Sequence, residues 1–443
     1  MKKTMKSLGL LLSLLLVSPS LVAQTEPDRD WIYEPTPEIL SARKEFQDNK
    51  FGIFIHWGVY SMVARGEWAL HSGGLDIDEY EHLPAAFYPS KFNAAEWVAA
   101  VKACGAKYIC FTTRHHDGFS MFHTAESDYN VVDGTPFGRD VLKELADECH
   151  KQGIRLHLYY SHIDWFRPDY PLGRTGHNTG RTLAPDWEGY YNFMNRQLTE
   201  LLTNYGPIGA IWFDGLWDKD QQPGFDWQLE EQYKLVHALQ PSCMVANNHH
   251  ITPYPGEDIQ IFERDLPGQN LAGLSGQDIS QLPLETCQTM NGMWGYKIQD
   301  RNYKSTKELV HLLVRAAGMN GNLLLNVGPR PDGAFPDQAL ERMAEVGAWM
   351  ETYGETLYGT RGGQVEPREW GVTTQKGNKT FVHILNAEDT GIFLPISKDK
   401  KVKSCVQFDN RTPVRYTQDK DGILLRLDAI PDAIDFVVEI EWK

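Results

Sequence analysis

Polar and ionisable side chains stand at the ends of several short apolar runs along the chain. Carboxylates in such positions can act as nucleophiles or as general acids and bases, and neutral imidazoles can both donate and accept hydrogen bonds. Six apolar runs end in groups of these kinds, at His56-Trp57-Gly58, Arg114-His115-His116-Asp117-Gly118, Tyr159-Tyr160-Ser161-His162, Trp212-Phe213-Asp214-Gly215, Glu263 and Asn326. We expect these polar ends to lie together along one edge of the fold and to form the functional site there.

Asp214 is a candidate catalytic carboxylate. It closes an apolar run that begins at Ile208 and it precedes Gly215, a position that fits either a turn cap or a functional acid. Trp212 lies two residues earlier and therefore on the same face of a strand, so a ring and a carboxylate would share one pocket. This pairing favours catalysis over a capping role.

The adjacent His115 and His116, followed by Asp117, could indicate a metal site or a site for hydroxyl groups. Neighbouring residues on a strand point to opposite faces, so both rings could face one ion only across a bulge. Neutral imidazoles suit the hydroxyl groups of a polyol, because they donate and accept. Hydrogen bonding to a polyol is therefore the favoured interpretation, and we expect no metal.

The elements that must position these groups are eight β-rich runs that alternate with amphipathic stretches. The runs are Phe51–Gly58, Lys107–Arg114, Arg155–Ser161, Ala210–Gly215, Met244–Asn248, Ile259–Arg264, Glu285–Met290 and Asn322–Gly328. The amphipathic stretches are 94–104, 139–152, 187–204, 227–239, 305–319 and 336–353. This alternation predicts a closed (β/α)₈ barrel, in which the carboxyl ends of the strands share one rim. No glycine-rich dinucleotide or phosphate fingerprint follows the first run.

The character of the sequence changes after Gly354. Residues 364–443 show alternating β-type segments and no long helix, which predicts a C-terminal β-sandwich. We therefore expect a catalytic barrel domain over residues 24–360 and a β-sandwich domain over residues 361–443.

The N-terminus has the pattern of a secretory signal peptide. Three lysines within the first six residues precede an apolar run, Leu8 to Val17, which is too short to span a bilayer. We expect cleavage after Ala23, which makes residues 1–23 the signal peptide, and export to the periplasm or the extracellular space. No later stretch is apolar enough for a transmembrane helix, so no membrane insertion is expected.

Charge and cysteine spacing limit the class of partner. The formal net charge is −16 at pH 7, whereas nucleic acids and anionic membrane surfaces bind basic faces, so neither is expected as a partner. The six cysteines are scattered and lack C-x-x-C spacing, which argues against a zinc site. A neutral substrate is the remaining expectation.

Several short motifs lie in order along the chain. They are Phe51–Gly58 (FGIFIHWG), Thr113–Phe119 (TRHHDGF), Tyr159–Ser161 (YYS), Trp212–Gly215 (WFDG), Asn326–Pro329 (NVGP) and Gly354–Arg361 (GETLYGTR). In this order they resemble the α-L-fucosidase family of glycoside hydrolases. The resemblance implies a retaining exo-hydrolase that removes terminal α-L-fucose from a fucosylated oligosaccharide or glycoconjugate without a cofactor.

The resemblance also implies roles for individual residues. Asp214 would be the nucleophile. The residues that would bind the sugar are His56, His115 and His116, with Glu67, Trp68, Tyr160 and Trp212 completing the pocket. Tyr159 could take the place of Tyr160, because a shift of one residue in strand register exchanges their faces.

Three glutamates are candidates for the general acid/base, which the resemblance places on a variable loop after the nucleophile. Glu263 stands at a predicted strand end and matches best. Glu285 belongs to a family-like segment but begins its strand, and Glu257 lies in a Pro/Gly turn where a solvated or capping role is common. We expect Glu263 to be the acid/base and keep Glu285 and Glu257 as alternatives.

The expected reaction is a double displacement, in which Asp214 attacks the anomeric carbon and Glu263 protonates the leaving oxygen. Two other functions stay open at this point. A related α-L-glycosidase, such as an α-L-galactosidase or a transfucosylase, would use similar chemistry. A fucose-binding protein without catalysis would not need both carboxyl groups.

Overall fold

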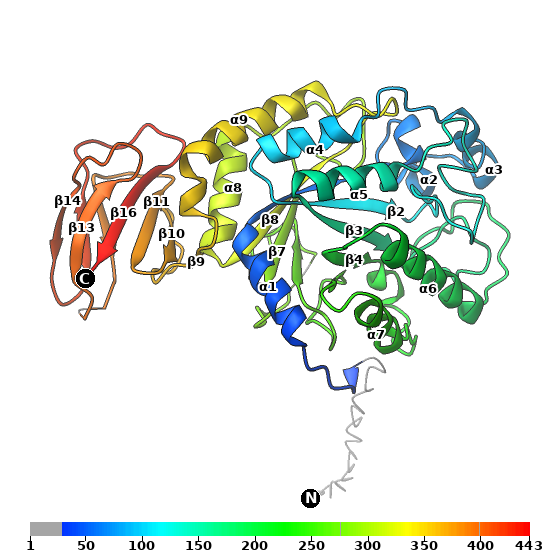
Figure 1. The fold of residues 1–443 in the computed structure, drawn as a ribbon, viewed down its shortest axis with the longest axis horizontal. Helices are drawn as coiled ribbons and strands as arrows, with labels where there is room; N and C mark the ends of the chain where they lie inside the picture. Colours follow the sequence, from blue (N-terminus) through cyan, green and yellow to red (C-terminus); the bar gives the residue numbers. More distant parts are fainter. Residues whose placement is uncertain (1–28, 275, 398) are drawn as a thin grey trace, which may run out of the picture.

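The computed structural model describes residues 29–274, 276–397 and 399–443. The predicted signal peptide, residues 1–23, lies outside these described residues. In the described chain an eight-stranded parallel sheet, covered by helices, is followed by two antiparallel sheets (Figure 1). The expected (β/α)₈ barrel with a C-terminal β-sandwich is confirmed.

The strands of the barrel follow the order β5-β4-β3-β2-β1-β8-β7-β6. A parallel bridge between Ala246 and Ile259 links β5 to the residue before β6 and so closes the sheet. Each strand overlaps one of the eight predicted runs. The strands are β1 (Phe51–Ile55), β2 (Tyr108–Arg114), β3 (Arg155–Ser161), β4 (Ala210–Asp214), β5 (Met244–Asn248), β6 (Gln260–Glu263), β7 (Leu284–Thr289) and β8 (Gly321–Val327).

Amphipathic helices cover the outside of the barrel (Figure 1). They match the predicted stretches and are α4 (Ala94–Ala103), α5 (Val141–Gln152), α6 (Trp187–Asn204), α7 (Leu229–Leu239), α8 (Thr306–Gly318) and α9 (Asp337–Tyr353). The sequence analysis did not predict α1 (Pro37–Asn49), which begins with Thr36 as its N-cap and a proline in its first turn. Two short helices, α2 (Ala69–Ser72) and α3 (Ile77–Tyr80), lie in the long connection after β1.

Side chains of the barrel strands alternate between the interior and the helices. On β4, Ala210 and Trp212 belong to the inner cluster, whereas Ile211 and Phe213 pack in the layer between sheet and helices. Trp212 stands in register with Tyr159 of β3, which also belongs to the inner cluster. The two-residue period therefore decides which polar strand ends face the barrel axis.

The C-terminal part is built from two antiparallel sheets with one apolar core between them. It packs beside α8 and α9 (Figure 1), and His311 of α8 lies 2.7 Å, Nε2 to oxygen, from the carbonyl of Ile434. The first sheet contains β13 (Val402–Gln407), β16 (Phe436–Trp442), β11 (Lys379–Ile384), β10 (Gly371–Lys376) and β9 (Arg361–Gly362), and the second β12 (Gly391–Leu394), β15 (Ile423–Arg426) and β14 (Arg415–Gln418).

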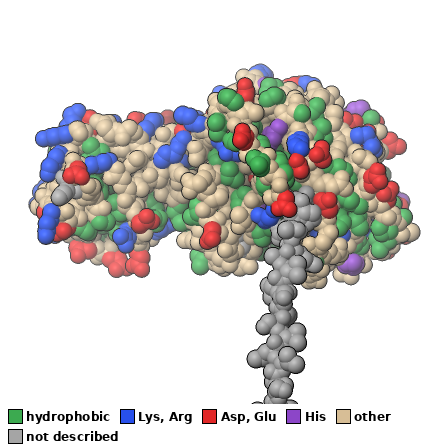
Figure 2. Space-filling view, turned by 90° about the horizontal axis from the view of Figure 1, so that it is seen from below, with side chains coloured by type: hydrophobic (Ala, Val, Ile, Leu, Met, Phe, Trp, Pro, Cys, Tyr) green, Lys and Arg blue, Asp and Glu red, His purple; other side chains and the backbone are tan. Residues whose placement is uncertain are grey.

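The described surface is mixed in charge on the face shown in Figure 2, where Lys and Arg side chains are interspersed with Asp and Glu. An extended basic stripe, as nucleic-acid backbones require, is not seen on that face. Among the helices of the described residues, none is both long and apolar enough to cross a membrane.

Candidate active site

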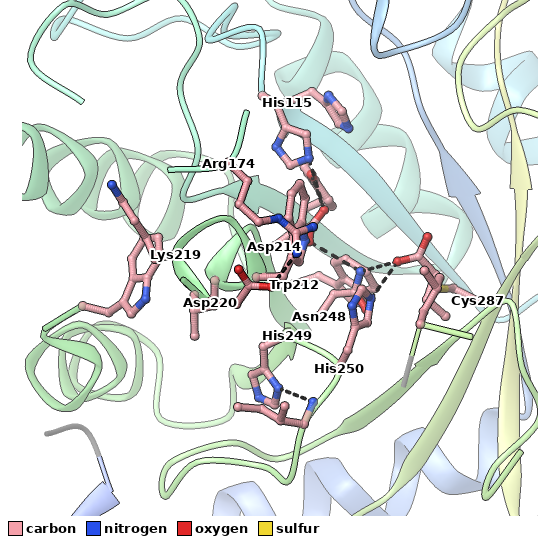
Figure 3. A pocket seen from close by; sticks show the side chains of 18 of the residues that line it. His115, Arg174, Trp212, Asp214, Lys219, Asp220, Asn248, His249, His250 and Cys287 are labelled. Carbon is pink, nitrogen blue, oxygen red and sulfur yellow. Dashed lines mark hydrogen bonds and ion pairs between the residues drawn. The ribbon is translucent and has the colours of Figure 1, made fainter. Parts of the chain in front are cut away.

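A cavity of about 640 Å³ opens at the carboxyl ends of the barrel strands. Figure 3 shows His115, Trp212, Asp214, Asn248 and His250 around it. Seven of the nine residues expected in the site or its sugar pocket line this cavity, namely His56, Trp68, His115, His116, Trp212, Asp214 and Glu263. The barrel thus brings together residues that are up to 207 positions apart in the sequence.

Asp214 ends β4 and accepts hydrogen bonds on both carboxyl oxygens. Tyr159 donates its hydroxyl to Oδ2 at 2.9 Å, and Trp217 donates Nε1–H to Oδ1 at 2.9 Å. Asn248, the last residue of β5, adds a longer contact to Oδ1 at 3.4 Å. Gly215 follows with φ 116°, a conformation that favours glycine and ends the strand directly after the carboxylate.

Glu263 ends β6 and faces the same cavity. Its Oε2 accepts Asn248 Nδ2–H at 2.8 Å and lies 3.0 Å from His250 Nε2. One amide nitrogen therefore contacts both carboxyl groups, which limits the distance between the two contacted oxygens to about 6 Å. The two carboxyl groups therefore lie close together at the barrel mouth.

The two carboxyl groups are electrostatically coupled. Burial, together with the charge of Glu263, raises the pKa of Asp214 to about 7, against the hydrogen bonds from Trp217 and Tyr159. Burial would also raise the pKa of Glu263, but the hydrogen bond and charge of His250, with the Asn248 amide, lower it below its ordinary value. The surroundings therefore shift the pKa values of the two carboxyl groups in opposite directions.

Three histidines form the polar wall beside Asp214. Burial lowers the pKa of His56 to about 3 and depresses the pKa of His115 and His116 well below the ordinary value, so all three rings are neutral at pH 7. His56 Nδ1 lies 2.7 Å from Asn326 Oδ1, and His116 Nδ1 lies 2.6 Å from Ser161 Oγ. Neutral rings can exchange hydrogen bonds with hydroxyl groups without adding charge to the site.

His115 and His116 both reach the cavity although they are neighbours. The register between β2 and β3 shifts between Thr112 and Arg114, and both histidines follow the end of β2. This local irregularity removes the alternation that would send one ring outward.

Two of the expected contacts lie elsewhere. Tyr160 points away from the cavity and donates its hydroxyl to Gln197 Oε1 at 2.7 Å, while Tyr159 lines the cavity. The reason is the strand period, because Tyr159 shares the inner face with its register partner Trp212. The expectation for Tyr160 is therefore corrected to Tyr159.

Glu67 is buried behind the cavity wall and does not line it. Its Oε2 accepts the backbone N–H of Gly295 at 2.7 Å, which ties Glu67 to the loop after β7. Its neighbour Trp68 does line the cavity and stacks on Trp217, with 5.8 Å between ring centroids.

Neither alternative acid/base lines the cavity. Glu285 lies deeper in the barrel, where it accepts hydrogen bonds from Tyr108 at 2.6 Å and Trp212 at 2.9 Å. Glu257 contacts His249 Nε2 at 3.0 Å and accepts the hydroxyl of Tyr233 at 3.0 Å. The structure therefore leaves Glu263 as the glutamate of the three that shares the cavity with Asp214.

Asn248 and His250 were missed in the sequence analysis. Met244–Asn248 was predicted as a strand, and its polar end could have been counted with the other strand ends. His250 could not have been found this way, because it lies two residues beyond the strand and its reach depends on the loop conformation.

A (β/α)₈ barrel that holds a close carboxyl pair, neutral imidazoles and tryptophan rings at its mouth has the site of a glycoside hydrolase. The sequence model of the family "Alpha-L-fucosidase" matches residues 20–355. The chain therefore belongs to the α-L-fucosidase family, and it is a glycoside hydrolase.

Individual relatives agree with this assignment. A plasma α-L-fucosidase from Rattus norvegicus is 30% identical over 394 residues, which cover 80% of this chain and 80% of the rat protein. The structure of α-L-fucosidase isoenzyme 1 from Paenibacillus thiaminolyticus is similar with a TM-score of 0.81 and 34% identity, covering 92% of this chain and 100% of that chain. The α-fucosidase of Thermotoga maritima, solved with a mechanism-based inhibitor, is similar with a TM-score of 0.74 and 26% identity, covering 92% of this chain and 100% of that chain.

Proposed function

We propose that this protein is a retaining exo-acting α-L-fucosidase that hydrolyses terminal α-L-fucose from glycans. Asp214 is the nucleophile and Glu263 the general acid/base. The observation that carries the proposal is the carboxyl pair at the barrel mouth, bridged by Asn248 through contacts of 3.4 and 2.8 Å. A separation of about 5–5.5 Å between carboxyl groups suits direct displacement, whereas inversion needs about 6.5–9.5 Å to admit a water molecule.

The reaction has two steps: Glu263 gives up a proton in the first and takes one up in the second. In the first, Asp214 attacks the anomeric carbon to form a glycosyl ester while Glu263 gives its proton to the departing glycosidic oxygen. In the second, Glu263 takes a proton from a water molecule, which attacks the anomeric carbon and releases Asp214. Two inversions at one carbon give net retention.

The nucleophile must be ionised when it attacks, although in the free site the pKa of Asp214 is raised to about 7. Positive charge develops at the anomeric carbon in the transition state, and it stabilises an ionised Asp214 beneath it. The Tyr159 and Trp217 donors act in the same direction. The pair then holds its single proton on Glu263, where the leaving oxygen needs it.

The wall of the cavity suits a 6-deoxy sugar. His56, His115 and His116 can bond to ring hydroxyls, and the Trp68 and Trp212 rings offer apolar surface to a methyl group. A hydroxymethyl group in that place would lose hydration without a partner. This argument favours α-L-fucosides over α-L-galactosides.

The cavity is also lined by Arg174, Gln222, Phe225 and Leu274, to which no role in binding the fucose is assigned. Cavities of about 300–1,000 Å³ hold molecules larger than one deoxyhexose, so this cavity can also hold the rest of a fucosylated oligosaccharide or glycoconjugate. With the predicted signal peptide, we place the enzyme in the periplasm or outside the cell.

The test is turnover of an aryl α-L-fucoside, followed by NMR of the first sugar released. We expect α-L-fucose before mutarotation. A β-product would contradict double displacement, faster turnover of the matched α-L-galactoside would shift the specificity, and dominant transfer to an added sugar would indicate a transfucosylase.

A further inference from the structure

Glu263 is held through one of its two carboxyl oxygens. Oε2 contacts both Asn248 Nδ2, at 2.8 Å, and His250 Nε2, at 3.0 Å. Oε1 accepts no hydrogen bond from any residue that the structure describes, and the side chain remains 16% exposed where it lines the cavity. The two oxygens of this carboxyl group therefore have different surroundings.

We propose that Asn248 and His250 are positioning residues that hold Oε2 of Glu263 and thereby place its transferable proton on Oε1. This inference rests on the proposed function. Asn248 Nδ2–H donates to Oε2, and the tautomer with a proton on His250 Nε2 donates to the same oxygen. With both donors in place, an O–H on Oε2 would find no acceptor, so the proton of the acid form sits on Oε1. Oε1–H then protonates the glycosidic oxygen as its bond to carbon breaks, and ionised Oε1 later accepts a proton from the attacking water.

The backbone supports a side-chain role for His250. Its φ is 68°, in the left-handed region, which strains the backbone of a residue with a Cβ. Glycine would form this turn without strain. The turn directs the two adjacent rings apart, because His249 contacts Glu257 while His250 contacts Glu263.

The donors also act on the charge of Glu263. Hydrogen bonds to a carboxylate stabilise its ionised form, in line with the lowered pKa of Glu263. Other titratable groups face or adjoin this carboxyl from every side of the site and remain in place when His250 is changed, namely Asp214, His56, Glu67, Tyr159, Arg264 and Cys287. Removing the His250 donor should therefore raise the pKa of Glu263.

The test compares His250→Gly with wild type on two fucosides, one with an activated aryl leaving group and one with a poor alkyl leaving group. We expect kcat/KM to fall about tenfold or more on the poor leaving group and less than about threefold on the activated one, because only the former needs a well-placed proton. The alkaline limb of the poor substrate's pH profile should move to higher pH. His250→Gln, which keeps an N–H donor, should recover part of the loss.

Two controls separate positioning from folding. Arg411→Gly removes another left-handed residue with a Cβ, φ 61°, in the C-terminal domain and should leave both rates unchanged. In a Glu263→Ala background, His250→Gly should cause no further loss, because its effect passes through Glu263.

Two outcomes would overturn the inference. Equal losses on both fucosides would mean that His250 binds the sugar, and a shift of the alkaline limb to lower pH would mean that the ring supplies the transferred proton. If wild type turns over neither fucoside, the proposed function itself fails. If wild type is active, Glu263→Ala shows the leaving-group dependence and His250→Gly behaves as wild type, the positioning role alone fails.

Discussion

The mouth of the barrel and the layer beneath it both carry buried carboxyl groups on inward-facing strand positions. At the mouth, Asp214 lines the cavity and has a pKa raised to about 7. Beneath it, Glu285 is fully buried, does not line the cavity, and also has a pKa raised to about 7. Burial is the first cause of both shifts.

These two carboxyl groups differ in what surrounds them. Glu285 has two donors, Tyr108 and Trp212, and no opening to a substrate. Asp214 has a second carboxyl group within reach of a shared amide, so its pKa responds to Glu263 as well as to burial. A perturbed pKa thus marks both layers. Access to the cavity and a charged partner distinguish Asp214, the carboxyl group that we propose to be catalytic.

Trp212 connects the layers. Its ring lines the cavity, and its Nε1–H donates to Glu285 at 2.9 Å. The lower carboxyl group therefore fixes one wall of the upper site. We therefore expect substitutions of the carboxyl groups at the mouth to change the kinetics strongly and substitutions in the layer beneath to change them little.

The largest effect is expected for Asp214→Ala. Turnover should fall by about 10⁴-fold or more, equivalent to roughly 5.5 kcal/mol of lost transition-state stabilisation, because the variant cannot form the covalent ester. Steady-state rates on an aryl fucoside measure the loss. Added azide should give a β-fucosyl azide, and near-wild-type activity would remove Asp214 from its proposed role.

Glu263→Ala should be next in size and selective. Poor leaving groups should slow by about 10²–10⁴-fold, whereas activated aryl fucosides should lose much less in kcat/KM, because they leave without protonation. A series of aryl fucosides with different leaving-group pKa values gives the dependence. If Glu285→Ala instead produced this pattern, the acid would lie in the lower layer, and the assignment of catalysis to the mouth alone would be wrong.

Tyr159→Phe and Tyr160→Phe are matched substitutions that test which of these adjacent residues of β3 faces the cavity. Loss of the Tyr159 hydroxyl removes a donor from Asp214, so the pKa of Asp214 should rise further. The acid limb of kcat/KM should then move to higher pH, with a loss of about tenfold near neutral pH for one charge-assisted hydrogen bond. Rates across the pH range measure both effects.

Tyr160→Phe should leave the pH profile unchanged, because its hydroxyl donates to Gln197 outside the cavity. The cost there is one neutral hydrogen bond, about 1 kcal/mol of folding stability. Equal shifts in the two variants would contradict the observed register.

The contrast between Tyr159 and Tyr160 also shows what the sequence could predict. The eight apolar runs and the C-terminal change of pattern were sufficient for the barrel and the sandwich, because strand period and helix period are local properties. Asp214, with Trp212 two residues before it, was recognisable for the same reason. Which of two adjacent tyrosines faces inward depends on register with a neighbouring strand, and this is not a local property.

Other parts of the site depend on tertiary contacts. Glu67 was expected in the sugar pocket, but its partner is the backbone of Gly295, 228 residues away. The backbone at His250 is left-handed although the residue is not glycine, so the sequence gives no signal for this turn. Short spacing patterns therefore identified the carboxyl candidates, and they missed Asn248 and His250, which contact Glu263.

The smallest kinetic effect is expected for Glu285→Gln, which tests the lower layer directly. The amide can accept Trp212 Nε1–H through its oxygen and donate to the Tyr108 hydroxyl, so the wall at Trp212 should persist and kcat/KM should change by less than about threefold.

The same substitution should change the folding stability with a definite sign. The pKa of Glu285 is raised from its ordinary value of 4.5, which applies to the unfolded chain, to about 7 in the folded protein. Between these pH values the folded state binds more protons than the unfolded state. The wild type therefore loses stability as the pH rises through this window. The variant lacks this term. Its melting temperature should exceed that of wild type at pH 8, and the difference should shrink towards pH 4–5. A constant difference across this range would mean that Glu285 does not titrate in the folded barrel, and a large loss of turnover would mean that the two layers act on the substrate together.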